Sequence, residues 1–162
     1  MSPLPIQGVS DGASALLLAS EDAVNKHNLT PLARLAGYAV AGCEPSIMGI
    51  GPVPAIRKML SQPALAKKHT LENVDLVDVN EAFAPQFLAV QKELKLDMDK
   101  TNLYGGAVAM GHPVGTSGAR ITAHLAHRLA SDANVKSAIG SACIGGGPVS
   151  YTHLTLPTIY PV

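Results

Sequence analysis

Residues that could support thiol-dependent acyl transfer occur in three short polar loops of the sequence. Cys143 ends an apolar stretch and is followed by Gly145, Gly146 and Gly147. Because glycines lack a Cβ, a ligand can approach their backbone closely, and successive N–H groups can point at an anion. A thiol beside such donors can lose its proton, and an oxyanion held by them is what acyl transfer requires. The alternative for Cys143 is an inert, buried small residue at the end of a strand.

His112 and Asn80 occupy the other two loops. His112 lies in the segment GGAVAMGHPVGTSG, where Pro113 favours an extended backbone at His112 and the glycines leave its ring open to a ligand. The imidazole could donate a hydrogen bond to a developing enolate or activate a thiol, or it could be a solvated loop side chain. Asn80 could hold a water molecule or a carbonyl through its amide, or it could cap a helix that begins there. Glu81 is expected to accept hydrogen bonds from neighbouring backbone donors.

Alternating strands and helices must position these loops. Apolar or alternating stretches predict strands at residues 15–20, 32–40, 74–79 and 137–143. Ser20 is expected to cap a helix over 21–27, and Pro54 is expected in the first turn of a helix that runs to Leu60. A spacing of three or four between apolar residues predicts two further helices, one from residue 80 and one after residue 118. Their apolar stripes are Phe83, Phe87, Val90 and Leu94 in the first and Ile121, Leu125 and Leu129 in the second.

This alternation predicts an α/β fold with helices packed on a sheet. In such sheets, binding sites form in the loops that leave the carboxyl ends of the strands. Asn80 and Cys143 follow predicted strands, and His112 lies in the glycine-rich loop over 105–118. We therefore expect the three side chains to gather at one edge of the sheet. The segment 42–54, with three Gly and three Pro, is expected to be a loop.

Composition excludes several other classes of function. The 162 residues carry 12 basic and 12 acidic side chains without a long Lys/Arg cluster, so an extensive nucleic-acid-binding surface is excluded. Apolar residues make up 47% of the chain, which excludes a disordered protein. The two cysteines have no CxxC spacing, and His124 and His127 are expected on a solvated helix face, so no metal or other cofactor is predicted. No apolar run reaches the roughly 20 residues that a membrane span needs.

The same loops resemble the thiolase family, and specifically the carboxyl-terminal half of 3-ketoacyl-CoA thiolases. The matching stretches extend over roughly residues 9–147. They are SDGASALLLASEDA, GCEPSIMGIGPVPAIRK, VDLVDVNEAFAPQ, GGAVAMGHPVGTSGARI and SACIGGG. The resemblance is strongest to the enzyme of the mitochondrial matrix, which implies that location and a role in fatty-acid β-oxidation. It also implies one half of the duplicated, layered α/β thiolase fold.

This resemblance implies a role for each candidate residue. Cys143 would be the acid/base thiol, which deprotonates acetyl-CoA in condensation or the incoming CoA thiol in thiolysis. His112 would activate the nucleophilic cysteine and bind a thioester oxygen, and Asn80 would hold the water that completes this oxyanion hole. The backbone N–H of Gly145 would contribute to a second oxyanion hole, and Met48 would line the substrate pocket. The implied partners are CoA thioesters and other thiolase subunits in a homo-oligomer.

The sequence also departs from the family pattern. The covalent nucleophile of the family is a cysteine of the amino-terminal half, and Cys43 is outside any such motif, so we expect these 162 residues alone to be inactive. Residues 1–8 and 148–162 do not match the family, so the domain is expected to span 9–147, and the tail carries no evidence of function. An alternative to catalysis is a half-subunit that associates with full-length thiolase.

Overall fold

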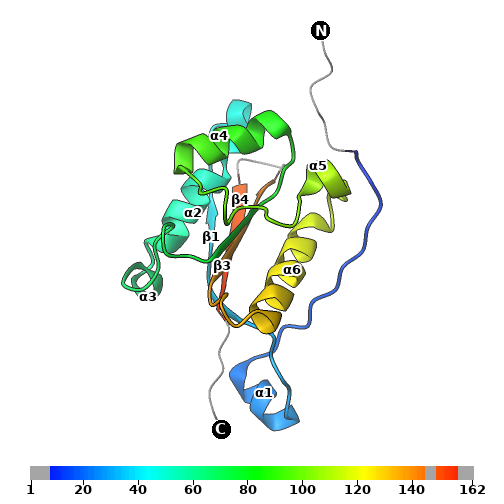
Figure 1. Ribbon diagram of the computed structural model, residues 1–162, viewed down its shortest axis with the longest axis vertical. Coiled ribbons are helices and arrows are strands. Elements are labelled where there is room, and N and C mark those ends of the chain that lie inside the picture. Colours follow the sequence, from blue (N-terminus) through cyan, green and yellow to red (C-terminus); the bar gives the residue numbers. More distant parts are fainter. Residues whose placement is uncertain (1–7, 145–148, 157–162) are drawn as a thin grey trace.

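A mixed four-stranded sheet forms the centre of the molecule (Figure 1). The computed structural model describes residues 8–144 and 149–156. In the sheet order β1-β4-β3-β2, the strands are β1 (Arg34–Ala41), β4 (Val149–Leu156), β3 (Ala138–Ile144) and β2 (Leu76–Val79). β2 runs parallel to β3, whereas β4 runs antiparallel to both β1 and β3. The carboxyl ends of β1, β2 and β3 therefore lie at the same edge of the sheet.

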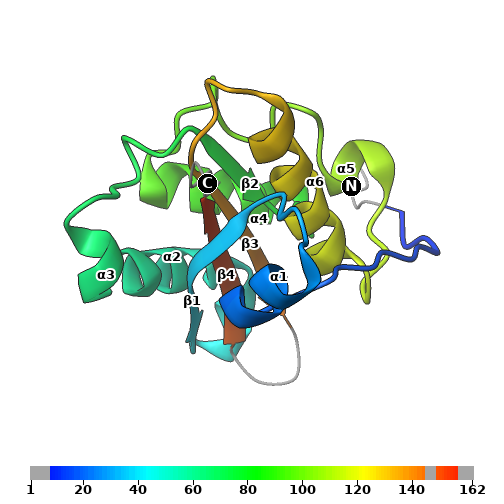
Figure 2. The same cartoon turned by 90° about the horizontal axis from the view of Figure 1, so that it is seen from below.

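Helices cover both faces of this sheet (Figure 1; Figure 2). On one face lie α2 (Pro52–Leu60) and α4 (Ala84–Leu94), and on the other lies α6 (Ser117–Ser131). The shorter helices are α1 (Glu21–His27), the 3-10 helix η1 (Pro45–Ile50), α3 (Pro63–Ala66) and α5 (Ala107–Met110). An α/β layer structure was predicted from the alternation of strands and helices. The layered arrangement confirms it.

Two apolar clusters hold the layers together, one on each face. The first contains Ile56 and Met59 of α2, Val90 of α4 and Ile139 of β3. The second packs the predicted α6 stripe, Ile121, Leu125 and Leu129, against the sheet. Each of these seven residues is at most 6% exposed. The packing of the helices on the sheet therefore removes apolar surface from water, and this burial is the main contribution to the stability of the fold.

Several predicted elements are confirmed with small changes of boundary. The Ser20 hydroxyl accepts a hydrogen bond from the Ala23 backbone N–H at 3.2 Å and caps α1 as expected. Strands β1, β2 and β3 correspond to the predictions at 32–40, 74–79 and 137–143. The two expected loops, 42–54 and 105–118, contain the short helices η1 and α5. β4 comes from the segment that the sequence analysis placed outside the domain.

The predicted strand at residues 15–20 is wrong. These residues are extended but pair with no strand in the described part of the chain. Leu17 is 86% exposed and Leu18 is 78% exposed. An apolar stretch becomes a buried strand only where a neighbouring strand supplies backbone partners and an opposing layer covers its side chains.

Within the described ranges, no helix is both long and apolar enough to cross a membrane.

Candidate active site

Asn80 lies directly after β2, at the edge where the three parallel strands end. Its backbone N–H donates to the Ser141 carbonyl of β3 at 2.8 Å. Asn80 as a whole is only 2% exposed. Of the two alternatives for Asn80, the helix cap does not apply, because α4 begins at Ala84 with a proline in its first turn. The Asn80 Oδ1 atom is buried and has no hydrogen-bond partner among the residues that the structure describes. A buried amide oxygen in this state can accept a hydrogen bond from a water molecule or a ligand.

His112 lies beside Asn80. Their nearest side-chain atoms, His112 Nε2 and Asn80 Nδ2, are 3.5 Å apart. The backbone N–H of His112 donates to the Gly8 carbonyl at 2.9 Å, and Arg120 Nη1 donates to the Gly111 carbonyl at 2.9 Å. Gly111 has a φ of 85°, a conformation that favours glycine. These contacts fix the loop that carries the imidazole.

Burial lowers the pKa of His112, and the nearby Arg120 guanidinium lowers it further. Both effects disfavour the imidazolium, so His112 is neutral at pH 7. The opposite nitrogen, Nδ1, lies 2.6 Å from the hydroxyl oxygen of Ser117, at the start of α6. The ring is therefore fixed from two sides. Its Nε2 atom faces the Asn80 amide.

Cys143 lies near the carboxyl end of β3, two residues after Ser141. Its thiol is free and partly buried. Burial raises the pKa of Cys143, a backbone hydrogen bond partly opposes this rise, and the Cys43 thiol adds to it, so the protonated form predominates at neutral pH. The thiolate that the glycine-rich sequence allowed is thus not the resting form. In the described residues no hydrogen bond joins Cys143 to His112 or to Asn80.

The remaining candidates differ in how the structure places them. Met48 lies in η1, which packs against β3, and is 41% exposed. The Cys43 thiol donates a long hydrogen bond of 3.8 Å to the Met48 carbonyl, outside the loops that carry the other candidates. Gly145 lies outside the described residues.

Glu81 has the structural role expected of it. Its carboxylate accepts hydrogen bonds from the Val108 backbone N–H at 2.9 Å and from Asn102 Nδ2 at 2.8 Å. Asn102 in turn bonds the backbone N–H and carbonyl of Val79 at 2.8 and 2.9 Å. Glu81 thereby ties α5 and the preceding loop to the end of β2. This places His112, which follows α5, next to Asn80.

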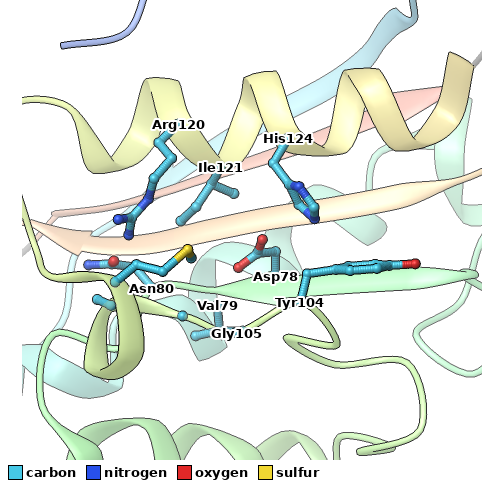
Figure 3. A pocket seen from close by; sticks show the side chains of 11 residues that line it. Asp78, Val79, Asn80, Tyr104, Gly105, Arg120, Ile121 and His124 are labelled. Atoms are coloured by element: carbon cyan, nitrogen blue, oxygen red, sulfur yellow. The ribbon is translucent and has the colours of Figure 1, made fainter. Parts of the chain in front are cut away.

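A cavity of about 110 Å³ lies between β2 and α6 (Figure 3). Asp78 and Asn80 line it from the β2 side, and Arg120, Ile121 and His124 line it from α6. Burial raises the pKa of Asp78 to about 6.

The sequence analysis predicted that both α6 histidines lie on a solvated face, and this is wrong for His124. His124 is partly buried, and the centre of its ring lies 5.2 Å from that of the Tyr104 ring. Within the described ranges, no group of His, Cys, Asp and Glu is arranged to hold a metal ion.

Sequence reasoning missed Ser117, Arg120 and Asp78. Asp78 carries a signal, because the alternation of VDLVDV places it on the face of β2 opposite Val77 and Val79. Ser117 lies at the end of the predicted His112 loop and Arg120 follows it, but nothing in their spacing shows that one contacts the imidazole and the other the Gly111 carbonyl. Their roles depend on how the loop folds back on the first turns of α6.

Comparisons with known proteins show which family has the sequence and fold of this chain. The sequence model described as "Thiolase, C-terminal domain" matches residues 29–154. Over 140 residues the chain is 64% identical to the mouse (Mus musculus) "3-ketoacyl-CoA thiolase, mitochondrial" and 63% identical to the human (Homo sapiens) protein of the same name. Each alignment covers 86% of this chain and 34% of the relative. The chain therefore spans about a third of the length of these relatives.

Solved structures give the same result. The crystal structure of human mitochondrial 3-ketoacyl-CoA thiolase in complex with CoA matches with a TM-score of 0.80 at 59% identity, over 87% of this chain and 34% of that one. The Bacillus anthracis acetyl-CoA acetyltransferase matches with a TM-score of 0.77 at 47% identity, over 86% of this chain and 34% of that one. Identity at this level, together with the family match over most of the chain, shows that the chain belongs to the thiolase family and contains its C-terminal domain.

Proposed function

We propose that the chain is the C-terminal part of an acetyl-CoA acyltransferase that cleaves 3-ketoacyl-CoA with CoA to give acetyl-CoA and a shortened acyl-CoA, or catalyses the reverse condensation. The main support is the contact between His112 and Asn80 at the edge of the sheet where Cys143 also lies. The similarity to mitochondrial thiolases supports the substrate class and a location in the mitochondrial matrix. No metal or further cofactor takes part, and CoA is a substrate.

In this proposal, His112 and Asn80 build an oxyanion hole for a thioester oxygen. His112 Nε2 faces Asn80, and the Oδ1 atom of Asn80, which has no partner within the described ranges, would hold a water molecule. Such a water can donate one hydrogen to Asn80 and the other to the oxygen that gains negative charge. The low exposure of Asn80 strengthens these hydrogen bonds, because bulk water does not compete for them. His112 also activates the nucleophilic cysteine, which lies outside these 162 residues.

Cys143 acts as an acid and then as a base. During thiolysis, the nucleophilic cysteine adds to the 3-keto carbon, and the carbon–carbon bond breaks to leave an acyl-cysteine and the enolate of acetyl-CoA. The Cys143 thiol, protonated at neutral pH because burial raises its pKa, protonates that enolate. The resulting thiolate removes the proton of the incoming CoA, which attacks the acyl-cysteine. The Gly145 N–H contributes to the second oxyanion hole, and Met48 lines the acyl pocket.

A chimeric enzyme tests this proposal. The segment of the mouse relative that aligns with this chain is replaced by the aligned residues of this chain, and thiolysis of acetoacetyl-CoA is measured. We expect turnover by the chimera and none by residues 1–162 alone. His112→Ala or Asn80→Ala in the chimera should lower kcat by about 10²–10³-fold, the usual cost of one oxyanion-hole donor. His27→Ala is the matched control, since His27 is exposed at the end of α1. Turnover that survives both site substitutions would refute the assigned roles.

A second candidate function is a non-catalytic half-subunit that associates with full-length thiolase. The observation that favours it is the exposure of apolar side chains in the extended segment before α1, where Val9, Leu17 and Leu18 are 83%, 86% and 78% exposed. Apolar surface of this kind favours association. The test mixes tagged chain with purified full-length mouse thiolase. Co-elution at a fixed stoichiometry that is lost in Leu17→Asp supports the candidate, and a chain that elutes alone contradicts it.

A further inference from the structure

The outer edge of β2 pairs with the segment that follows α4, as far as Asn102. The Val77 N–H donates to the Lys100 carbonyl at 2.9 Å, and the Asn102 N–H donates to the Val77 carbonyl at 2.9 Å, in the manner of a parallel strand. Residues two apart in a strand present their backbone groups to the same edge. Val79 therefore presents its N–H and its carbonyl to this edge as well, directly before Asn80, and both groups need partners.

Asn102 supplies these partners with its side chain. Its φ of 50° lies in the left-handed region, which Asn adopts more readily than most residues, and its own carbonyl accepts the Gly105 N–H at 3.0 Å. The backbone thus turns away from β2 at this residue. In its place, Asn102 Oδ1 accepts the Val79 N–H at 2.8 Å and Asn102 Nδ2 donates to the Val79 carbonyl at 2.9 Å. The amide replaces the backbone groups that would otherwise continue the pairing.

The remaining hydrogen of this amide goes to Glu81. Nδ2 carries two hydrogens, and the second is donated to Glu81 Oε1 at 2.8 Å. The opposite orientation of the amide would put Nδ2 against the Val79 N–H and Oδ1 against a carbonyl and a carboxylate. These three contacts therefore fix the orientation of the Asn102 side chain, and an ionised carboxylate at this position could make only one of them.

Val79 and Glu81 are the two residues that flank Asn80, so the Asn102 side chain holds the chain on both sides of it. We propose that Asn102 is a positioning residue, which sets the place of the Asn80 side chain through the Val79 backbone and the Glu81 carboxylate. If the proposed function holds, on which the catalytic part of this inference rests, loss of the Asn102 amide displaces Asn80 from the thioester oxygen. The chemical step then slows while substrate binding changes little.

Hydrogen exchange in the ¹⁵N-labelled 162-residue chain tests the contacts that support this inference. On its outer edge, the Val79 N–H has the Asn102 side chain as its acceptor, whereas the Val77 N–H has a backbone acceptor, the Lys100 carbonyl. We expect the Val79 N–H to exchange within about tenfold of the rate of the Val77 N–H. Exchange at Val79 that is faster than this would overturn the proposal, whether or not any Asn102 variant folds.

Asn102→Gly tests whether the amide positions Asn80, because glycine adopts the left-handed backbone without strain. Asn28→Gly is the matched control: Asn28 has the same φ of 50° at the end of α1, and its side chain makes no hydrogen bond among the described residues. In Asn102→Gly, the side-chain amide signals of Asn80, assigned by their loss in Asn80→Asp, should shift, and their hydrogens should exchange at least about tenfold faster. Unchanged Asn80 signals in a folded Asn102→Gly would overturn the proposal.

Kinetics in the chimera separate positioning from a general loss of stability. Asn102→Gly should lower kcat by about 10–100-fold and change KM by less than about threefold, while Asn28→Gly leaves both unchanged. Asn102→Asp, which keeps the size of the side chain but loses both donors, should show the same loss if the glycine variant does not fold. Equal kcat values in the Asn102 and Asn28 variants would overturn the proposal. A chimera that is inactive before any substitution, with the expected exchange at Val79 and the expected Asn80 signals, would refute the proposed function and leave the role of Asn102 intact.

Discussion

Asp78 is a carboxylate that the fold holds at the expense of stability. It lines the cavity between β2 and α6, and burial is the main reason that its pKa rises from 3.8 to about 6. Arg120 opposes this shift and Glu81 adds to it. The gap between the two pKa values corresponds to about 3 kcal/mol. Since the folded state binds this proton more tightly than the unfolded state, ionised Asp78 destabilises the fold above pH 6, and the penalty disappears as the pH falls from about 6 to about 4.

Asp78→Asn removes the charge and keeps the shape of the side chain. We expect the variant to be more stable than the wild type by up to about 3 kcal/mol at pH 7–8, with a difference that shrinks toward zero near pH 4. Urea unfolding followed by circular dichroism across this pH range measures it. The lowered pKa values of His112 and His124 contribute equally to both proteins, so they cancel in the difference.

Asp99→Asn is the matched control, because Asp99 is exposed in the loop after α4 and should show no such pH-dependent difference. A loss of stability in Asp78→Asn at pH 8 would refute the reasoning. A difference that stays constant from pH 4 to pH 8 would refute it as well, since it would show that the charge of Asp78 is not the cause.

Two further substitutions test the packing that positions the site, each by urea unfolding. Gly106→Ala should destabilise the fold by about 1–3 kcal/mol, because the added methyl group would meet the Glu81 carboxylate, which is held by two hydrogen bonds. Gly115→Ala, where the methyl group would enter open space, should have little effect, and equal losses at the two glycines would contradict this account. Ile56→Ala should cost about 2–5 kcal/mol, since Ile56 is 1% exposed. Ile47→Ala should lower the free energy of unfolding far less, because Ile47 is 59% exposed. Similar losses in the two variants would show that burial does not determine the contribution of these side chains to stability.

Local patterns predicted the elements whose stability depends on local chemistry and on one packed face. The apolar stripe of Ile121, Leu125 and Leu129 identified α6, because a helix that buries one face needs this spacing. Ser20 identified the start of α1, because a serine cap depends only on the backbone donors of the next turn. These signals are contained within a few residues, so the sequence displays them directly.

Features that depend on distant partners were not predicted. The apolar stretch over 15–20 has the composition of a strand, but strand formation needs a neighbour, and the described residues provide none. Asn80 has the residue type of a helix cap, but Glu81 bonds to Asn102 and Val108, and the chain turns before α4 begins. In both cases contacts far along the chain override the local preference.

The candidate site was predicted in its location better than in its chemistry. Sequence reasoning placed Asn80, His112 and Cys143 in loops at the strand ends, and the structure brings the first two into contact at the shared edge. The protonated state of Cys143 could not be read from its neighbours, because it depends on burial by the surrounding fold. The hydroxyl of Ser117 was missed for the same reason, since its contact with the imidazole exists only after the loop folds.

The proposed function depends most directly on Cys143 as the acid/base thiol, and a comparison of two cysteine variants tests this role. In the chimera with the mouse relative, thiolysis of acetoacetyl-CoA is measured for Cys143→Ser and for Cys43→Ser. The two changes are chemically identical and involve the two cysteines of this chain, both of which are free. We predict that Cys143→Ser lowers kcat by about 10²–10⁴-fold, the usual contribution of acid/base catalysis, while Cys43→Ser leaves kcat nearly unchanged. Equal rates in the two variants, or a larger loss in Cys43→Ser, would contradict the account.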